Sequence, residues 1–159
     1  MYPHMEATKF PLYVLYRAPR NYLEEFIMRI DDGVKDEGHK NALFLQENEE
    51  DDELSTHSTQ THVKAYLNHS IQDLAMINIS KFWNNTTKTS AKYFAILTDS
   101  LARRDLVQVA AIGHNPQNPE DEPNRDNLSL KTFNIHIRDA SMCLISLGSG
   151  EMEIEDWLA

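Results

Sequence analysis

The spacing of apolar residues predicts two short strands joined by a helix in the first third of the chain. Residues 10–16 and 42–46 are short runs of aromatic and aliphatic side chains, which is typical of buried strands. Between them, from Tyr22 to Ile30, apolar residues recur every three or four positions and charged residues occupy the other side. This pattern indicates an amphipathic helix, and Pro19 suits its first turn.

The middle of the chain predicts two further helices. Apolar residues at helical spacing predict a helix within residues 61–83, and the turn-rich sequence of residues 84–87 separates it from the next element. Thr89 or Ser90 is placed to cap a second helix, which we expect to continue to Arg104.

The last third predicts strands. Residues 106–112 form an apolar run that ends at a glycine, and residues 130–137 alternate apolar and polar side chains. Residues 142–147 are apolar and are expected to pair with residues 130–137 as an antiparallel hairpin. The order of elements predicts the α+β class, with a mixed or antiparallel sheet, a C-terminal β-hairpin and about three helices.

Length and composition indicate one domain. With 159 residues, 41% of them hydrophobic, the chain is long enough to bury a core. We expect a single globular α+β domain over residues 1–150, with exposed acidic loops at residues 47–58 and 114–126 and an acidic C-terminal tail at residues 151–159. The expected core consists of the residues on the apolar stripes: Leu12, Val14, Phe26, Ile30, Leu67, Leu74, Leu97, Leu101, Val109, Phe133, Ile135 and Leu144.

The compartment is suggested by two features of the sequence. The single cysteine, Cys143, lies in an apolar run, so we expect an inert core thiol and a reducing environment. The N-terminal residues lack a basic and apolar leader, and no apolar stretch approaches the length of a membrane span. Both features predict a cytoplasmic protein with no membrane partner.

Charge is distributed unevenly along the chain. The formal net charge is −10, and the acids concentrate in residues 47–53, where six of seven are acidic, in residues 120–126 and in the last nine residues. Residues 79–104 are basic instead. Acidic segments on an otherwise balanced body steer encounter with a partner. We therefore expect a protein partner with a basic surface, and a homo-oligomer is compatible with the same pattern.

The acidic segments supply the candidate partner-binding residues. The tail has two natural arrangements: it docks on its own domain, or it presents its terminal aromatic and leucine to a partner. The residues predicted to contact a partner are Glu49, Glu50, Asp51, Asp52, Asp156, Trp157 and Leu158.

Three histidines are the weak candidates for chemistry: His57, His62 and His136. The segment His57-Ser58-Thr59 resembles one half of the paired His-x-Thr motif of the 2H phosphoesterases. In the segment that begins at His136, Arg138 stands where the second hydroxyl belongs, so the resemblance carries no activity to this chain. His57 and His62 lack a completing ligand at metal-site spacing, so we predict no metal and no cofactor.

Basic residues of the middle segment suggest a nucleic-acid surface. They are interleaved with aromatic side chains, the combination that single-stranded nucleic acid requires. The aromatic residues fall largely on the expected core stripe, which weakens this interpretation. The basic residues concerned are Lys81, Lys88, Lys92, Arg103 and Arg104.

The sequence thus favours a non-enzymatic acidic interaction protein over an enzyme. It would act as an adaptor, inhibitor or assembly factor, of the kind that viruses and mobile elements encode, through its acidic loops and tail. One alternative is a phosphate-ester hydrolase or nuclease that uses His57, His62 or His136. The other is a nucleic-acid-binding protein that uses residues 79–104 and is autoinhibited by the acidic tail.

Overall fold

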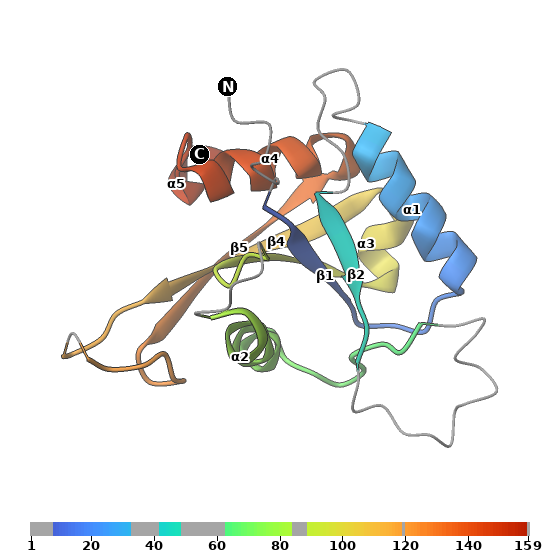
Figure 1. The fold of residues 1–159 in the computed structure, drawn as a ribbon. Coiled ribbons are helices and arrows are strands. Elements are labelled where there is room, and N and C mark those ends of the chain that lie inside the picture. Colours follow the sequence, from blue (N-terminus) through green and yellow to red (C-terminus); the bar gives the residue numbers. More distant parts are fainter. Residues whose placement is uncertain (1–7, 33–41, 49–62, 84–88, 119, 159) are drawn as a thin grey trace.

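The computed structural model describes residues 8–32, 42–48, 63–83, 89–118 and 120–158. In these residues a mixed sheet has the strand order β2-β1-β3-β4-β5 (Figure 1). Strand β1 is parallel to its neighbours β2 and β3, whereas β3, β4 and β5 are successively antiparallel. The strands are β1 (Phe10–Val14), β2 (Leu43–Gln46), β3 (Tyr93–Leu97), β4 (Leu106–His114) and β5 (Leu128–His136).

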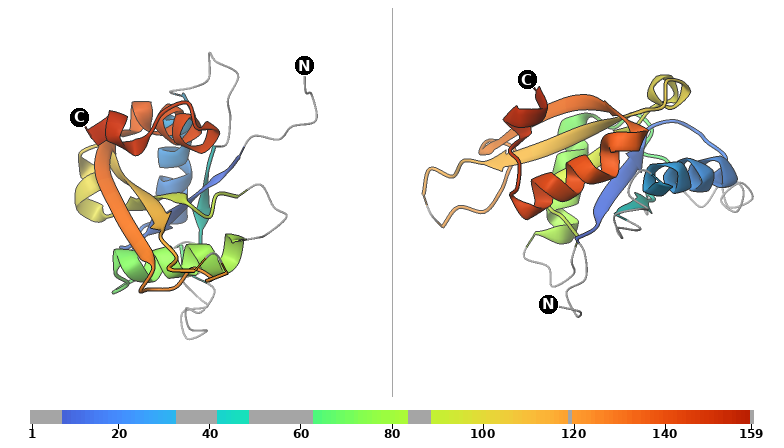
Figure 2. Two further views of the ribbon diagram at one scale, coloured as in Figure 1. Left: turned by 90° about the vertical axis from the view of Figure 1, so that its left-hand side faces the viewer. Right: turned by 90° about the horizontal axis from the view of Figure 1, so that it is seen from above.

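Helices cover both faces of this sheet. Helices α1 and α4 pack together on one face and α2 lies on the other, as Figure 2 shows from two further sides. The helices are α1 (Arg20–Asp32), α2 (Ile71–Phe82), α3 (Asp99–Arg103), α4 (Ile137–Ser149) and α5 (Ile154–Leu158).

Each face of the sheet has its own hydrophobic core because successive strand residues point to opposite sides. Leu12 and Val14 of β1 join the cluster beneath α1 and α4, whereas Tyr13 joins the cluster beneath α2. In β3, Phe94 and Ile96 likewise face α2. Most expected core residues are buried, although Phe133 and Ile135 of the edge strand β5 are only partly buried and Leu67 is half-buried.

The predicted α+β class with a mixed sheet and a single domain is confirmed. The elements predicted at residues 10–16, 42–46, 106–112 and 130–137 are strands, and the amphipathic pattern after Pro19 is helix α1. The buried residues of α1 are Leu23, Phe26 and Ile30, which is the spacing expected of a helix with one apolar stripe. The turn expected at residues 84–87 lies outside the described residues.

The helix predicted from Thr89 or Ser90 to Arg104 is wrong. Tyr93–Leu97 is the strand β3, and only the short helix α3 follows it. Every residue of β3 is buried, because β3 lies inside the sheet and helices cover both of its faces. Such a strand is a continuous apolar run without alternation, which periodicity cannot distinguish from a buried helix.

The strand predicted at residues 142–147 is also wrong. These residues belong to α4, and the antiparallel hairpin is formed one element earlier by β4 and β5. Ile137, Ala140, Leu144 and Leu147 are buried at helical spacing. His136 caps the helix, since its Nδ1 accepts a hydrogen bond from the Arg138 amide at 3.2 Å.

The helix predicted within residues 61–83 is shorter than expected. It begins at Ile71, where Ser70 and Asp73 form a reciprocal capping box with N–O distances of 3.1 and 3.2 Å. Asn68 has a φ of 64°, a left-handed conformation that interrupts any helix before Ser70. Residues 63–66 instead run beside β1, and the Tyr66 amide donates to the Val14 carbonyl at 2.8 Å.

The tail docks on its own domain. Helix α4 ends at Gly150, whose φ of 82° is the left-handed C-cap conformation. Beyond it, Ile154 is buried and Trp157 packs against the main core. Glu155 forms an ion pair with Lys131 of β5. Of the two arrangements considered for the tail, the structure contains the docked one.

Candidate functional site

The parallel part of the sheet contains a topological switch point beside β1. The connection from β1 through α1 leads to β2 on one side, and the connection through α2 leads to β3 on the other side. The two connecting helices therefore lie on opposite faces of the sheet, as right-handed crossovers require. The loops that follow β1 and β3 begin at neighbouring strand ends and lead to α1 and α3, which lie on the same face of the sheet. In open α/β sheets, ligands bind beyond the carboxyl ends of the strands, where such loops begin.

A pocket of about 540 Å³ lies at this switch point. Its walls are residues 16–19, which follow β1, together with Tyr22 of α1 and Asp99 and Arg103 of α3, which follow β3. The volume falls within the range of about 300–1,000 Å³ that is usual for small-ligand sites. The fold itself therefore positions this pocket, because both of its walls begin at the carboxyl ends of neighbouring strands.

Charged groups line the pocket. Arg103 Nε donates to Asp99 Oδ1 at 3.2 Å, and Arg103 Nη2 forms an ion pair with Asp99 Oδ2 at 3.1 Å. Since a guanidinium has five N–H donors, this pairing leaves donors available. Arg17 is exposed at the opposite wall. With two arginines and one aspartate, the pocket is locally positive on a chain whose net charge is −10.

Two tyrosines complete the wall. The Tyr16 hydroxyl is buried and has no hydrogen-bond partner among the described residues. Burial, together with the nearby Tyr22 and Asp99, raises the pKa of Tyr16 to about 12, so the phenol keeps its proton at neutral pH. The Tyr22 side chain is 39% exposed and stacks on Phe26 of the core with ring centroids 6.3 Å apart. Its outer ring face is a flat surface beside the charged groups.

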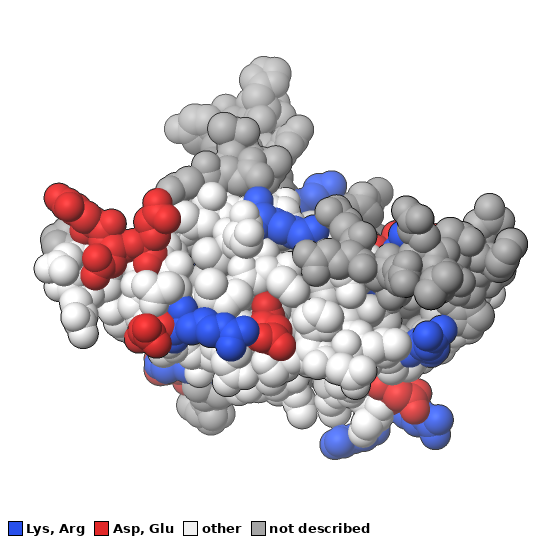
Figure 3. All heavy atoms as spheres, turned by 90° about the horizontal axis from the view of Figure 1, so that it is seen from below, with Lys and Arg blue, Asp and Glu red and all other residues white. Residues whose placement is uncertain are grey.

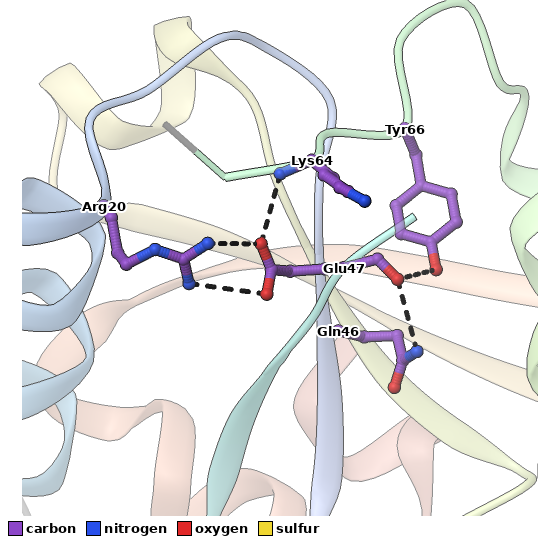
Figure 4. A network of polar contacts seen from close by, with 5 residues as sticks. All are labelled: Arg20, Gln46, Glu47, Lys64 and Tyr66. Carbon is purple, nitrogen blue, oxygen red and sulfur yellow. Dashed lines mark hydrogen bonds and ion pairs between the residues drawn. The ribbon is translucent and has the colours of Figure 1, made fainter. Parts of the chain in front are cut away.

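A polar network holds the start of α1 in place (Figure 4). Arg20 donates to both Glu47 carboxylate oxygens at 2.7 and 3.4 Å, and the Lys64 amide donates to the same carboxylate at 3.3 Å. The Tyr66 hydroxyl and the side-chain amide of Gln46 donate to the backbone carbonyl of Glu47 at 2.9 and 3.5 Å. These bonds join α1, the end of β2 and residues 63–66.

The network stabilises the charged form of Glu47. Partial burial alone would raise the pKa of this carboxyl, but the hydrogen bonds from Arg20 and the Lys64 amide outweigh it and hold the pKa below its usual value. Because Arg20 immediately follows residues 16–19, the network also fixes the direction in which that pocket wall leaves β1.

The acidic loop between β4 and β5 is ordered by asparagine side chains. The Asn124 amide donates to Asn127 Oδ1 at 2.7 Å, and Asn127 Nδ2 donates to the Glu122 carbonyl at 2.9 Å. The Asn118 amide donates to Asp121 Oδ2 at 3.1 Å, and Asn115 and Asn127 pair through their backbones at 2.7 Å. This loop was predicted to be exposed and irregular. It is exposed, but Asx-type turns give it a defined shape.

This loop lies at one end of the molecule. The β4–β5 hairpin extends beyond the helices (Figure 1), and acidic side chains gather at this end (Figure 3). Arg125 anchors the loop to α2 through Asp73, with an N–O distance of 2.6 Å. Glu120, Glu122 and Asp126 are exposed and form no ion pair within the described part of the chain.

Of the residues predicted to contact a partner, only those of the tail are described. Glu49, Glu50, Asp51 and Asp52 lie outside the described residues. Trp157 packs against the core, and Asp156 is exposed and accepts a hydrogen bond from the Glu153 amide at 2.8 Å. Leu158 is the last residue of α5.

The candidate catalytic histidines do not form a site in the described residues. His57 and His62 lie outside them, and the ring of His136 serves as the cap of α4. No group of three or more His, Cys, Asp or Glu side chains able to hold a metal occurs in the described ranges. Cys143 is buried, and burial raises the pKa of its thiol to about 12.

The basic residues of the middle segment are separated in space. Lys81 lies at the end of α2 on one face of the sheet, whereas Arg103 and Arg104 end α3, which packs into the core of the opposite face. Lys92 lies against the Tyr93 ring at 5.2 Å, and Lys88 lies outside the described residues. Trp83 is 40% exposed and contacts the edge of His114. The described cations therefore do not form one continuous surface.

Sequence reasoning missed the pocket at the switch point. Tyr16 and Arg17 lie at the end of the strand predicted at residues 10–16, so their place at a strand end is available from the sequence. The sequence prediction places Asp99 inside a helix and Arg103 at the C-terminal end of that helix, because it does not recognise β3. Without β3 the two walls of the pocket could not be brought together.

Comparisons with protein-family models, with curated proteins and with solved structures find no match to this chain. Within the described ranges, no helix is both long and apolar enough to span a bilayer. The function is therefore argued from the geometry of the chain itself.

Proposed function

We propose that this protein is a non-enzymatic interaction protein that binds a basic surface of a partner protein through its acidic end. The acidic end consists of the loop at residues 114–126, which is anchored on the α2 face of the sheet, and the tail, residues 151–158, which is docked on the opposite face. The observation that carries the proposal is the order of the loop. Its asparagine side chains and the Arg125–Asp73 ion pair hold Glu120, Glu122 and Asp126 outward in a defined arrangement.

The order of the loop matters because binding normally costs the entropy of fixing the groups that make contact. A loop that is already held by its own hydrogen bonds loses less freedom on association, so its carboxylates contribute more of their interaction to affinity. Carboxylates without an internal partner also attract cations during diffusional encounter. Acidic residues that served solubility alone would need no such scaffold.

The docked tail adds charge to the same end of the molecule. Glu155 pairs with Lys131 in the half of β5 that leads from the loop, and this places α5 beside the hairpin. Glu151, Glu153 and Asp156 remain exposed. Trp157 stabilises this arrangement from the core side, so we assign it to docking of the tail and not to contact with a partner.

The proposal is tested with a variant that removes charge from the loop without changing its scaffold: Glu120→Gln, Glu122→Gln and Asp126→Asn together. The matched control removes the same charge from the exposed side of α1, through Glu24→Gln, Glu25→Gln and Asp32→Asn. Proteins captured by each chain are quantified at low and at high salt.

We expect the parent and the α1 control to retain one or a few basic proteins that the loop variant loses. In a binding measurement with the purified partner, the loop variant should have an affinity about tenfold or more below that of the parent. Added salt should slow the association of the parent more than that of the loop variant. Equal capture by all three chains would contradict the proposal. So would capture of nucleic acid instead of protein.

A further inference from the structure

We propose that the pocket at the switch point, formed by residues 16–19, Tyr22, Asp99 and Arg103, binds a small phosphorylated molecule. In this assignment Arg17 and Arg103 contact the phosphate and Asp99 accepts a hydrogen bond from a hydroxyl of the ligand. The inference is independent of the acidic end of the molecule.

The position of the pocket is the first argument. In open α/β sheets ligands bind beyond the carboxyl ends of the strands, and this pocket lies at such an end, between the loops that follow β1 and β3. Here the register places Leu97, the last residue of β3, beside Val14, the last residue of β1. The two loops that line the pocket therefore start from adjacent points on a rigid, fully buried pair of strands.

The charges of the pocket select the ligand. Arg103 donates one hydrogen bond to Asp99 and forms an ion pair with it, which leaves further guanidinium donors available, and Arg17 supplies a second exposed guanidinium. Planar guanidinium groups match the oxygens of phosphates better than a point charge does. A pocket with this lining favours an anion, although the net charge of the chain is strongly negative.

The remaining groups favour a ligand larger than a free ion. The volume of about 540 Å³ exceeds what inorganic phosphate fills, and the exposed face of Tyr22 offers a flat contact for a sugar or aromatic ring. The Tyr16 phenol carries its proton at neutral pH, as a tyrosine ordinarily does, and burial raises its pKa further, to about 12. It is therefore a donor in the wall whose hydrogen bond no described residue satisfies.

The test uses ADP, ribose 5-phosphate, inorganic phosphate and adenosine as probes, each titrated into the full chain labelled with ¹⁵N. Amide chemical shifts locate binding and give the dissociation constant of each probe. We expect ADP and ribose 5-phosphate to shift residues 16–22 and 98–103. Inorganic phosphate should bind the same residues more weakly, and adenosine should bind more weakly than ADP because it lacks the charged group.

Two variants separate the pocket from general attraction of anions. Arg17→Gln removes a lining guanidinium that forms no ion pair with the described residues, and we expect it to weaken ADP binding about tenfold or more. Arg104→Gln removes the same charge from an exposed residue that does not line the pocket, and it should leave the affinity unchanged. The amide spectrum of each variant reports whether it is folded.

The proposal is overturned if no phosphorylated probe shifts the amides of residues 16–22 and 98–103 at millimolar concentration. It is also overturned if Arg104→Gln weakens binding as much as Arg17→Gln, because attraction by net charge would then explain the affinity. Binding of adenosine as tight as that of ADP would exclude phosphate as the recognised group.

Discussion

Replacing Asn78 by leucine tests the packing of α2 on the sheet more sharply than any other single change. Asn78 is fully buried within an apolar cluster. Its side-chain oxygen accepts from the Tyr13 hydroxyl at 2.7 Å, and its nitrogen donates to the Ser90 and Ala91 carbonyls at 3.0 and 2.9 Å. The side-chain amide of Asn78 thus joins α2, the interior strand β1 and the segment that leads into β3.

The expected loss of unfolding free energy follows from the polar groups that Asn78→Leu leaves without a hydrogen-bond partner. Leucine has the same branching and number of heavy atoms as asparagine but is larger, so no cavity forms, and the Tyr13 hydroxyl and the two carbonyls lose their partner. A buried polar group without a hydrogen bond costs about 1–3 kcal/mol. Some relaxation toward water is available to the carbonyls, so we expect the free energy of unfolding to fall by about 3–5 kcal/mol, a large part of a typical total of about 5–15.

The assay is urea denaturation followed by circular dichroism, with the m-value checked for two-state behaviour. Tyr13→Phe removes one hydroxyl and should cost about 1–2 kcal/mol. In the double variant the unpaired hydroxyl is absent, so the combined cost should be smaller than the sum of the single costs by about 1 kcal/mol. As a control, Asn134→Leu on the exposed side of β5 should change stability by no more than about 0.5 kcal/mol.

Two results would refute this reasoning. An Asn78→Leu variant as stable as the parent would show that the amide is not buried among these partners. Exact additivity of the Tyr13 and Asn78 substitutions would show that the two side chains do not interact. If Asn78→Leu fails to fold, the Tyr13→Phe variant still measures the cost of the shared hydrogen bond.

Three further predictions concern other parts of the molecule. Phe26→Ala should lower the free energy of unfolding by about 3–5 kcal/mol in urea denaturation, whereas Phe133→Ala should cost about 1–3 because Phe133 is only partly buried; equal costs would contradict the burial in the structure. Glu47→Gln should cost about 1 kcal/mol at neutral pH. Since the folded state lowers the pKa of Glu47, its contribution is present above the ordinary carboxyl pKa and is lost as pH falls through the folded value, so parent and variant should converge in stability in acid. Trp157→Ala should lower the unfolding free energy by about 1–3 kcal/mol, because the tail is docked, and an unchanged melting temperature would place Trp157 outside the core.

The sequence predicted those elements whose burial is one-sided. Helix α1 buries Leu23, Phe26 and Ile30 along one side, and in the second half of β5 the partly buried Phe133 and Ile135 flank the exposed Asn134, so the apolar residues repeat at the period of the element. Strand β3 is buried on both faces, so its apolar run has no period at all. In α4, the residues from Met142 to Ile145 are apolar without interruption, so this short run alone shows no helical spacing. The helical spacing of the buried residues is apparent only when the pattern is followed from Ile137.

The two candidate sites also differ in how well the sequence predicts them, because one is local in the sequence and the other is not. The acidic loop is local, so its charge and its turn residues were visible in one continuous stretch. The pocket joins two segments that lie more than 75 residues apart, and they meet only because β1 and β3 are neighbours in the sheet. Strand pairing of this kind is a property of the whole fold, which a single sequence does not display.

The strand directions also explain how one acidic chain could hold an anion. Strand β4 is antiparallel to β3, so its first residue lies near the pocket and its last residue leads into the acidic loop. Its nine residues span about 30 Å at about 3.3 Å per residue. That distance is several times the screening length of about 8 Å at physiological ionic strength. Repulsion from Glu120, Glu122 and Asp126 is therefore largely screened at the pocket, where Arg17 and Arg103 determine the local potential. For the same reason, charge substitutions in the loop and in the pocket should have independent effects on binding.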